Sequence, residues 1–289
     1  MMYTFHYAAL THPGRVPENN EDNFYINGSY KSDPKEACCQ TKGTADRGRL
    51  TASVCDGMGG YAAGEEASLI AVQTMSEFCK KEKEGEVLFR DRPMDYVNEA
   101  NARICRLRER VGKPTGSTLT VMEFADGVFT ALNIGDSRIY LCRDDALIQL
   151  STDHSVLARM IRMGQITEEE AKTHPLRHQI TQHFGIRPEE MVLEPAILQE
   201  EIHAGDLYLL CSDGLTDMVD DEVILRYLGT ADLSLTEKVE KLVQRAVDAG
   251  GRDNITVVLI EAEEKKGFWT KLRDRFSWQS TGKEIEDEG

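Results

Sequence analysis

Acidic residues stand beside glycine or asparagine at five separate places in this chain. Each place joins an apolar, strand-like run to a turn that exposes a carboxylate, as where Ser53-Val54-Cys55 leads into Asp56-Gly57. Carboxylates, backbone carbonyls and water are the ligands that Mg²⁺ and Mn²⁺ prefer, whereas the Cys and His ligands of zinc are absent from these turns. The pattern therefore predicts a shared site for divalent cations. Its candidate acidic residues are Glu21, Asp22, Asp56, Asp136, Asp213 and Asp253.

The chain as a whole limits what such a site can serve. Its 289 residues, 40% hydrophobic and 29% charged, are enough for one large domain or two small ones with a buried core. The net charge of −16 argues against nucleic acid as the main partner, because the phosphate backbone demands positive surface. A phosphorylated substrate stays compatible, since bound cations reverse the local sign of the field. The sequence has no HExxH, CxxC or GxxxxGK[ST] motif that would indicate another chemistry.

Short apolar runs predict the strands that position the acidic turns. Strands are expected at residues 3–10, 23–26, 50–55, 207–211 and 255–260. Four further runs, separated by turn residues, are interpreted as an antiparallel meander at 117–124, 128–134, 139–142 and 146–150. Because the acidic residues flank these runs, the ends of the strands should carry the site.

Helical periodicity marks the remaining regular elements. Apolar residues at spacings of three and four predict amphipathic helices at 62–81, 97–111 and around 239–246. Residues 27–49 are interpreted as a polar hairpin or insertion. Residues 151–190 are polar with short helical patches, which is typical of a mobile or binding segment between strands.

Cysteine usage indicates a reducing compartment. The seven cysteines are an odd number, and Cys55, Cys142 and Cys211 lie inside apolar runs where a reduced cysteine behaves as a small hydrophobe. The first residues show no charged segment followed by a long apolar core, and no apolar run approaches the ~20 residues that span a bilayer. We therefore expect a cytoplasmic protein.

Seven short motifs run in order through about residues 3–262. They are NNED ending at Asp22, DGMGG from Asp56, GST from Gly116, NIGDSR from Asn133, DHS from Asp153, SDGLTD from Ser212 and GRDNIT from Gly251. Each motif is weak alone, but seven in this order are highly specific. Together they resemble the PP2C-type (PPM) metal-dependent protein serine/threonine phosphatases in their compact bacterial form.

The resemblance implies a fold and a set of metal ligands. The fold is α+β, a four-layer α/β/β/α sandwich of two antiparallel sheets flanked by helix pairs, with the metals at one edge. By position, Asp56 would bridge two Mg²⁺ or Mn²⁺ ions, one of which Asp213 and Asp253 would complete. The other implied ligands are Glu21 or Asp22 with the Gly57 carbonyl for the second ion, and Asp136 with Asp213 for a weaker third ion.

The implied activity is hydrolysis of phosphoserine and phosphothreonine in proteins, with Asp22, Asp56 and Asp213 as the catalytic residues. A water that bridges two divalent cations has a lowered pKa, so hydroxide is available to attack phosphorus in line. By family analogy the substrates include a Ser/Thr kinase or a phosphorylated regulator. Two alternatives stay open: a catalytically weak phosphoprotein-binding module, and a hydrolase of small phosphomonoesters.

Two positions depart from the family pattern. Members usually carry an arginine that grips the substrate phosphate five residues before the last Asp of the NED triplet, and here Pro17 holds that place. Arg15 is the candidate replacement. Met58 stands where eukaryotic members have a histidine general acid, so the leaving-group proton is expected from a metal-bound water or from a histidine such as His178 in the flap-like segment 151–190.

Residues 263–289 lie beyond the phosphatase-like domain, which is expected to span 1–262. This tail places Phe268, Trp269, Leu272, Phe276 and Trp278 among lysines and arginines and then ends in an acidic stretch. A basic segment with aromatics can dock on a membrane surface or a partner, or it can pack on its own acidic domain. Both possibilities stay open.

Overall fold

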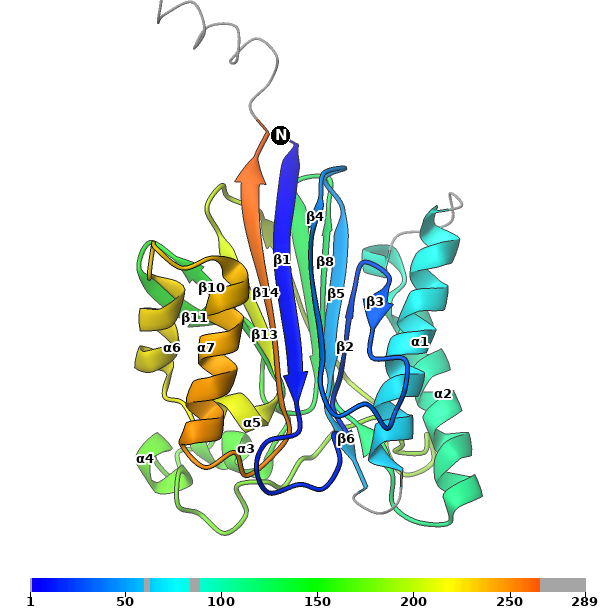
Figure 1. Cartoon of the computed structure of the whole chain (residues 1–289). Coiled ribbons are helices and arrows are strands. Elements are labelled where there is room, and N and C mark those ends of the chain that lie inside the picture. The colour runs from blue at the N-terminus through cyan, green and yellow to red at the C-terminus, as the bar shows by residue number, and fades with distance from the viewer. Residues whose placement is uncertain (1, 60–62, 84–88, 266–289) are drawn as a thin grey trace, which may run out of the picture.

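Two six-stranded antiparallel sheets lie face to face in the computed structural model, which describes residues 2–59, 63–83 and 89–265. Helices cover the outer face of each sheet (Figure 1). The first sheet has the order β11 (Ala146–Gln149), β10 (Arg138–Arg143), β13 (Leu207–Cys211), β14 (Ile255–Glu264), β1 (Tyr3–His12) and β4 (Cys39–Ala45). The second has the order β12 (Ala196–Glu201), β9 (Val128–Ile134), β8 (Leu119–Ala125), β5 (Leu50–Cys55), β2 (Asn23–Ile26) and β3 (Ser29–Tyr30).

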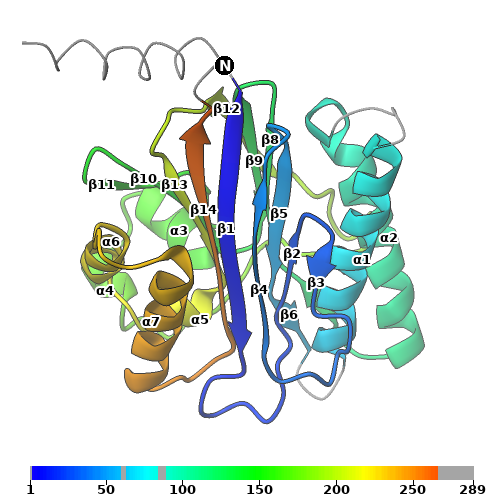
Figure 2. The same cartoon turned by 45° about the horizontal axis from the view of Figure 1, so that its top comes forward.

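The helices form the two outer layers. Figure 2 keeps α1 (Gly64–Lys83) and α2 (Pro93–Val111) on one side of the sheets, and α6 (Asp221–Leu228) and α7 (Leu235–Asp248) on the other. The four-layer α/β/β/α prediction is confirmed. The short elements are η2 (Phe89–Asp91), α3 (Val156–Arg162), α4 (Glu168–Ala171), α5 (Asp213–Thr216), and a two-stranded pair of β6 (Gly57–Met58) with β7 (Gly116–Ser117).

Three apolar cores hold the layers together. Phe5, Phe124 and Tyr208 pack between the two sheets, Tyr96 packs between the second sheet and α1–α2, and Leu242 packs between the first sheet and α5–α7. Central strands such as β5, β8 and β13 are covered on both faces and buried along their whole length. This is why they read as continuous apolar runs instead of alternating with polar residues.

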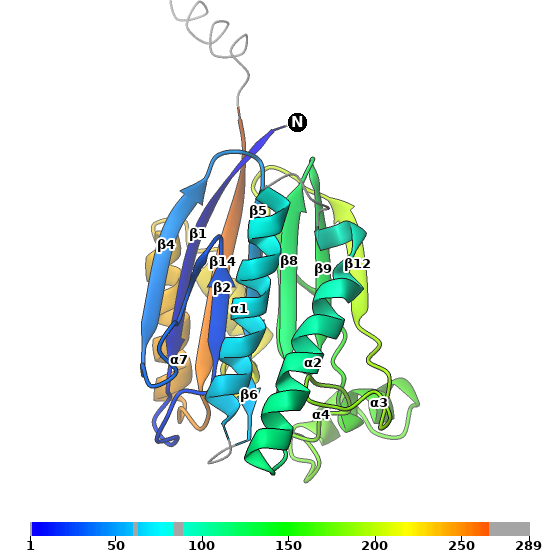
Figure 3. The ribbon, with the colours of Figure 1, turned by 90° about the vertical axis from the view of Figure 1, so that its right-hand side faces the viewer.

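The antiparallel register gathers the acidic turns at one edge. Cys55 at the end of β5 pairs with Asn23 at the start of β2, and Cys211 at the end of β13 pairs with Arg138 at the start of β10. In Figure 1 the ends of these strands lie towards the lower edge of the molecule, where β6 and α5 are labelled, and Figure 3 shows β6 at the same edge. Turns that are far apart in sequence therefore meet there.

The predicted meander is wrong. β9 and β10 belong to different sheets, because the turn between them carries the chain from the second sheet to the first, where β10 pairs with β11 and β13. Short apolar runs do not reveal which sheet a strand joins.

Two further differences concern exposed elements. The polar segment 27–49 contains β4, an edge strand paired with β1 whose residues are mostly accessible. The edge strand β12 and the helices α5 and α6 had not been predicted; β12 is exposed along much of its length and so has no apolar run.

The ends of the described chain lie away from the acidic edge. Lys265 donates its backbone N–H to the Met2 carbonyl, which places the end of β14 beside the start of β1 (Figure 1). The tail residues with the aromatic and basic pattern lie outside the described residues. No helix in the described ranges is long and apolar enough to cross a bilayer.

Candidate metal centre

Asp22 is fixed by hydrogen bonds that use only one of its two carboxylate oxygens. The residue is fully buried, and its Oδ2 accepts hydrogen bonds from Ser212 Oγ and Thr256 Oγ1, both at 2.7 Å. Its Oδ1 is buried without a hydrogen-bond partner in the described part of the chain. The two hydroxyls thus orient the carboxylate and leave one oxygen available.

Thr118 of the GST motif connects the turns that carry Asp56 and Asp136. The Asp56 N–H donates to Thr118 Oγ1 (2.9 Å), and the Thr118 N–H donates to the Asp56 carbonyl (2.8 Å). Thr118 Oγ1 also lies 2.7 Å from Ser137 Oγ. One threonine therefore holds both acidic turns in register.

The SDG and GRDN turns pack backbone against backbone. Asp213 begins α5, and a Cβ added to Gly214 would lie 2.0 Å from the Asn254 carbonyl oxygen, so only glycine permits this approach. Asn254 in turn accepts from the Glu21 N–H at Oδ1 (2.7 Å) and donates to the Asn19 carbonyl (2.9 Å). This side chain joins the turn of Asp253 to the turn of Glu21.

Glu21 and the Gly57 carbonyl converge at the start of α1. A Cβ placed on Gly64 would lie 2.3 Å from Glu21 Oε2 and 2.9 Å from the Gly57 oxygen. Both oxygens therefore face the same small space, which a larger residue at position 64 would fill. That the two oxygens serve one cation stays a prediction.

The acidic side chains act on one another electrostatically. Burial, followed by the charges of Asp22, Asp213 and the other cluster carboxylates, raises the pKa of Asp56 well above its usual value. Burial and the neighbouring Asp136 raise the pKa of Asp213 in the same direction. Burial raises the pKa of Asp22 to about 6, against the opposing effect of its bonds to Ser212 and Thr256. Carboxylates from five turns thus share one region.

The residues present fit a divalent cation. Asp22, Asp136 and Asp213 each have a buried Oδ1 with no hydrogen-bond partner among the described residues. Buried polar atoms normally find partners, so three such oxygens in one acidic region are the signature of ligands arranged for an ion. All donors are hard oxygens, which suit Mg²⁺ or Mn²⁺.

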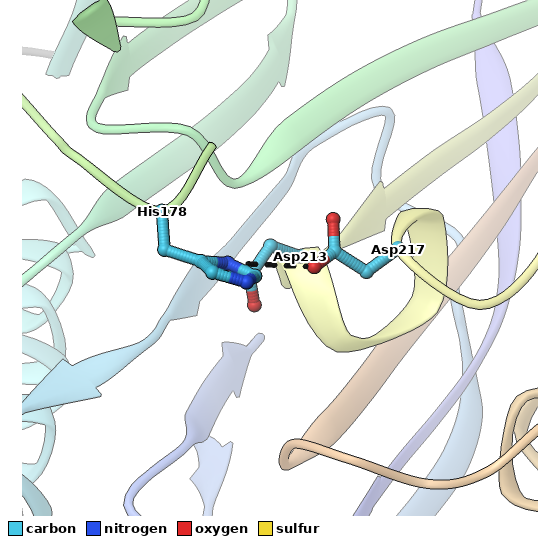
Figure 4. Close-up of side chains that lie close together, drawn as sticks. All are labelled: His178, Asp213 and Asp217. Atoms are coloured by element: carbon cyan, nitrogen blue, oxygen red, sulfur yellow. Dashed lines mark ion pairs between the residues drawn. The ribbon is translucent and has the colours of Figure 1, made fainter. Parts of the chain in front are cut away.

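The flap-like segment 151–190 brings His178 to this cluster (Figure 4). His178, Asp213 and Asp217 offer ligand atoms that all lie within 4.8 Å of one another, and His178 Nδ1 is 3.5 Å from Asp217 Oδ2. Arg177 Nε donates to His178 Nε2 at 2.8 Å. A neutral His178 accepting this bond carries its proton on Nδ1, the nitrogen that faces Asp217.

The guanidinium of Arg15 pairs with Asp248, which is not one of the predicted metal ligands. Its guanidinium is more than half exposed and contacts Asp248 Oδ1 at 3.2 Å, while its backbone N–H donates to the Gly251 carbonyl. Pro17 lies in the same loop after β1 and offers no donor. The role of Arg15 as a phosphate ligand stays a prediction.

Several supporting residues had not been singled out from the sequence. Ser212, Thr256 and Asn254 lie inside the SDGLTD and GRDNIT motifs, so their position next to predicted ligands was an available signal. Lys31 had no such signal in the sequence, because it lies in the polar segment 27–49. In the structure it is fully buried beside Asn20.

A family model described as protein phosphatase 2C matches residues 33–255. Protein phosphatase PhpP of Streptococcus pneumoniae is 34% identical over 272 residues, which cover 89% of this chain and 98% of that protein. Serine/threonine protein phosphatase PstP of Mycobacterium tuberculosis is 35% identical over 256 residues, or 88% of this chain, but the match spans only 44% of the length of PstP.

A solved structure of a phosphatase is also similar to this chain. A crystal structure of the PstP catalytic domain in complex with two manganese ions superposes with a TM-score of 0.73 at 32% identity, covering 91% of this chain and all of that one.

Proposed function

Because this chain belongs to the protein phosphatase 2C family, we propose that it hydrolyses phosphoserine and phosphothreonine in proteins in a reaction that depends on Mg²⁺ or Mn²⁺. One observation carries the proposal. Carboxylates from separate turns meet at one edge of the sandwich, and three of their oxygens, on Asp22, Asp136 and Asp213, are buried without a hydrogen-bond partner among the described residues.

Each predicted ligand has a place in this proposal. Asp56, whose pKa is raised by the charges of four neighbouring aspartates, would contact two cations. Asp213 and Asp253 would complete one of them, and Glu21 or Asp22 with the Gly57 carbonyl would serve the other. Asp136 and Asp213 would hold a third, weaker ion. When bound, such cations supply a water of lowered pKa as the nucleophile and neutralise the phosphoryl oxygens.

The chain's own residues keep the ligands in place and orient the substrate. Ser212 and Thr256 hold the Asp22 carboxylate, and Thr118 holds the turns of Asp56 and Asp136. His178, on the flap-like segment, lies with Nδ1 3.5 Å from Asp217 Oδ2, and in its imidazolium form it is a candidate donor of the leaving-group proton. Since all these groups are pre-arranged by the fold, little reorganisation is required during the reaction.

The biological setting follows from the relatives. PhpP and PstP are bacterial phosphatases by name, so we propose that this chain acts in bacterial signalling on a phosphorylated regulator or a Ser/Thr kinase, in the cytoplasm. Docking of the tail on a partner or membrane surface belongs to the same proposal.

The decisive experiment measures hydrolysis of a phosphothreonine peptide and of p-nitrophenyl phosphate, with Mn²⁺ and with EDTA. Wild type and Asp213→Ala are compared with Asp232→Ala, an exposed aspartate on the surface as the matched control. Activity that requires Mn²⁺, favours the peptide and is lost only in Asp213→Ala supports the proposal. A preference for the small ester would favour a phosphomonoester hydrolase, and metal binding without turnover would favour a phosphoprotein-binding module.

A further inference from the structure

Lys31 is a fully buried lysine beside the turn that carries Glu21 and Asp22. It follows β3, and the Asn23 side chain holds its backbone on both sides: Lys31 N–H donates to Asn23 Oδ1 (3.0 Å), and Asn23 Nδ2 donates to the Lys31 carbonyl (2.9 Å). These buried bonds fix the lysine next to the acidic turn at the backbone level.

The ammonium of Lys31 is directed at the backbone of that turn. Nζ donates to the Asn20 carbonyl oxygen at 2.5 Å, a neutral acceptor where a buried ammonium usually has a carboxylate. Burying an ammonium without a partner carboxylate is costly. Burial accordingly lowers the pKa of Lys31, while the negative charge of Asp22 raises it.

The Asn20–Glu21 peptide is therefore held from two sides. Lys31 binds its carbonyl oxygen, and Asn254 Oδ1 accepts its N–H at 2.7 Å. A peptide unit fixed at both its oxygen and its nitrogen cannot rotate, so the backbone enters the Glu21-Asp22 turn in one direction. Glu21 follows this peptide directly, and the Asp22 carboxylate is held in addition by Ser212 and Thr256.

We propose that Lys31 is a positioning residue for the cation site: its hydrogen bond to Asn20 fixes the Asn20–Glu21 peptide and thereby aims Glu21 and Asp22. The inference rests on the proposed function only in that the site binds a divalent cation. The charge of Lys31 acts in the opposite direction from its hydrogen bond, because an ammonium repels a nearby cation. Loss of positioning weakens cation binding, whereas loss of charge alone strengthens it.

The test is calorimetric titration of Mn²⁺ into the full-length protein without substrate, well below the melting temperature. Lys31→Met removes the donor and the charge, and the matched control is Lys42→Met on the exposed part of β4. We expect Lys31→Met to bind Mn²⁺ about tenfold more weakly, the size expected when a hydrogen bond from a charged donor is lost. Lys42→Met should bind as wild type does. At saturating Mn²⁺ the KM for a phosphopeptide should be unchanged in both.

A second variant keeps the test open if Lys31→Met does not fold. Lys31→Gln has no charge and a side chain one bond shorter, which withdraws its N–H donor from the Asn20 carbonyl. Loss of positioning should then outweigh loss of repulsion, so Mn²⁺ should bind about threefold more weakly. Equal or tighter Mn²⁺ binding in either folded variant, even with a lowered melting temperature, overturns the proposal. Wild type that binds Mn²⁺ without hydrolysing phosphopeptides would refute the proposed function and leave this test intact.

Discussion

Asp136→Asn should stabilise the metal-free protein while weakening its affinity for cations. Burial, followed by the charges of Asp153 and Asp217, raises the pKa of Asp136 from 3.8 to about 6. Between these values an unfolded chain loses the proton while the folded protein retains it. At low pH Asp136 is protonated in both states and does not reduce the free energy of unfolding. As pH rises from about 4 to 6 the free energy of unfolding falls, and above the folded pKa the reduction stays constant.

The size of the effect follows from the same two values. At 1.36 kcal/mol for each unit of pKa, the ionisable Asp136 lowers the free energy of unfolding by about 1 kcal/mol at pH 4.5, where only the unfolded chain is ionised, and by about 3 kcal/mol at pH 7.5. Asparagine has nearly the same shape and no charge, so it removes this cost. In EDTA the free energy of unfolding should thus rise by up to about 3 kcal/mol at pH 7.5 and by less at pH 4.5.

Urea unfolding in EDTA at both pH values, monitored by far-UV circular dichroism, measures this difference. Asp232→Asn, an exposed aspartate, is the control and should change stability at neither pH. Added Mn²⁺ should stabilise the wild type more than Asp136→Asn, because the variant lacks the negative charge of a proposed ligand. The reasoning is refuted if Asp136→Asn is less stable than wild type in EDTA at pH 7.5, or if its gain is the same at both pH values.

Two other predictions concern the substrate and the tail. Pro17→Arg should lower the KM for a phosphopeptide by about tenfold through one charge-assisted phosphate contact, with kcat little changed; an unaltered KM in steady-state kinetics would show that position 17 does not reach the phosphate. Both tryptophans of the chain, Trp269 and Trp278, lie in the tail, so tryptophan fluorescence reports on the tail alone. We expect a solvent-like tryptophan emission that shifts to the blue with anionic vesicles; a blue-shifted emission without vesicles would show instead that the tail packs on its own acidic domain.

The sequence alone determined most of the elements and which acidic residues are candidates for the site. Strands β2, β5, β9 and β13 lie at the predicted bounds, because strands covered on both faces read as continuous apolar runs. The acidic residues at the ends of these strands were visible as turns, and the order of seven motifs indicated the family.

Only the tertiary structure decided how these pieces are joined. Which sheet a strand enters depends on long-range pairing, so the crossing from β9 to β10 could not be read from apolar runs. Lys31 gave no local signal, because a lysine in a polar segment is normally exposed. It is buried here since Asn23 and the carbonyl of Asn20 hold it against the acidic turn. Sequence patterns report the neighbours along the chain, whereas the position of a buried charge depends on contacts between segments that the fold brings together.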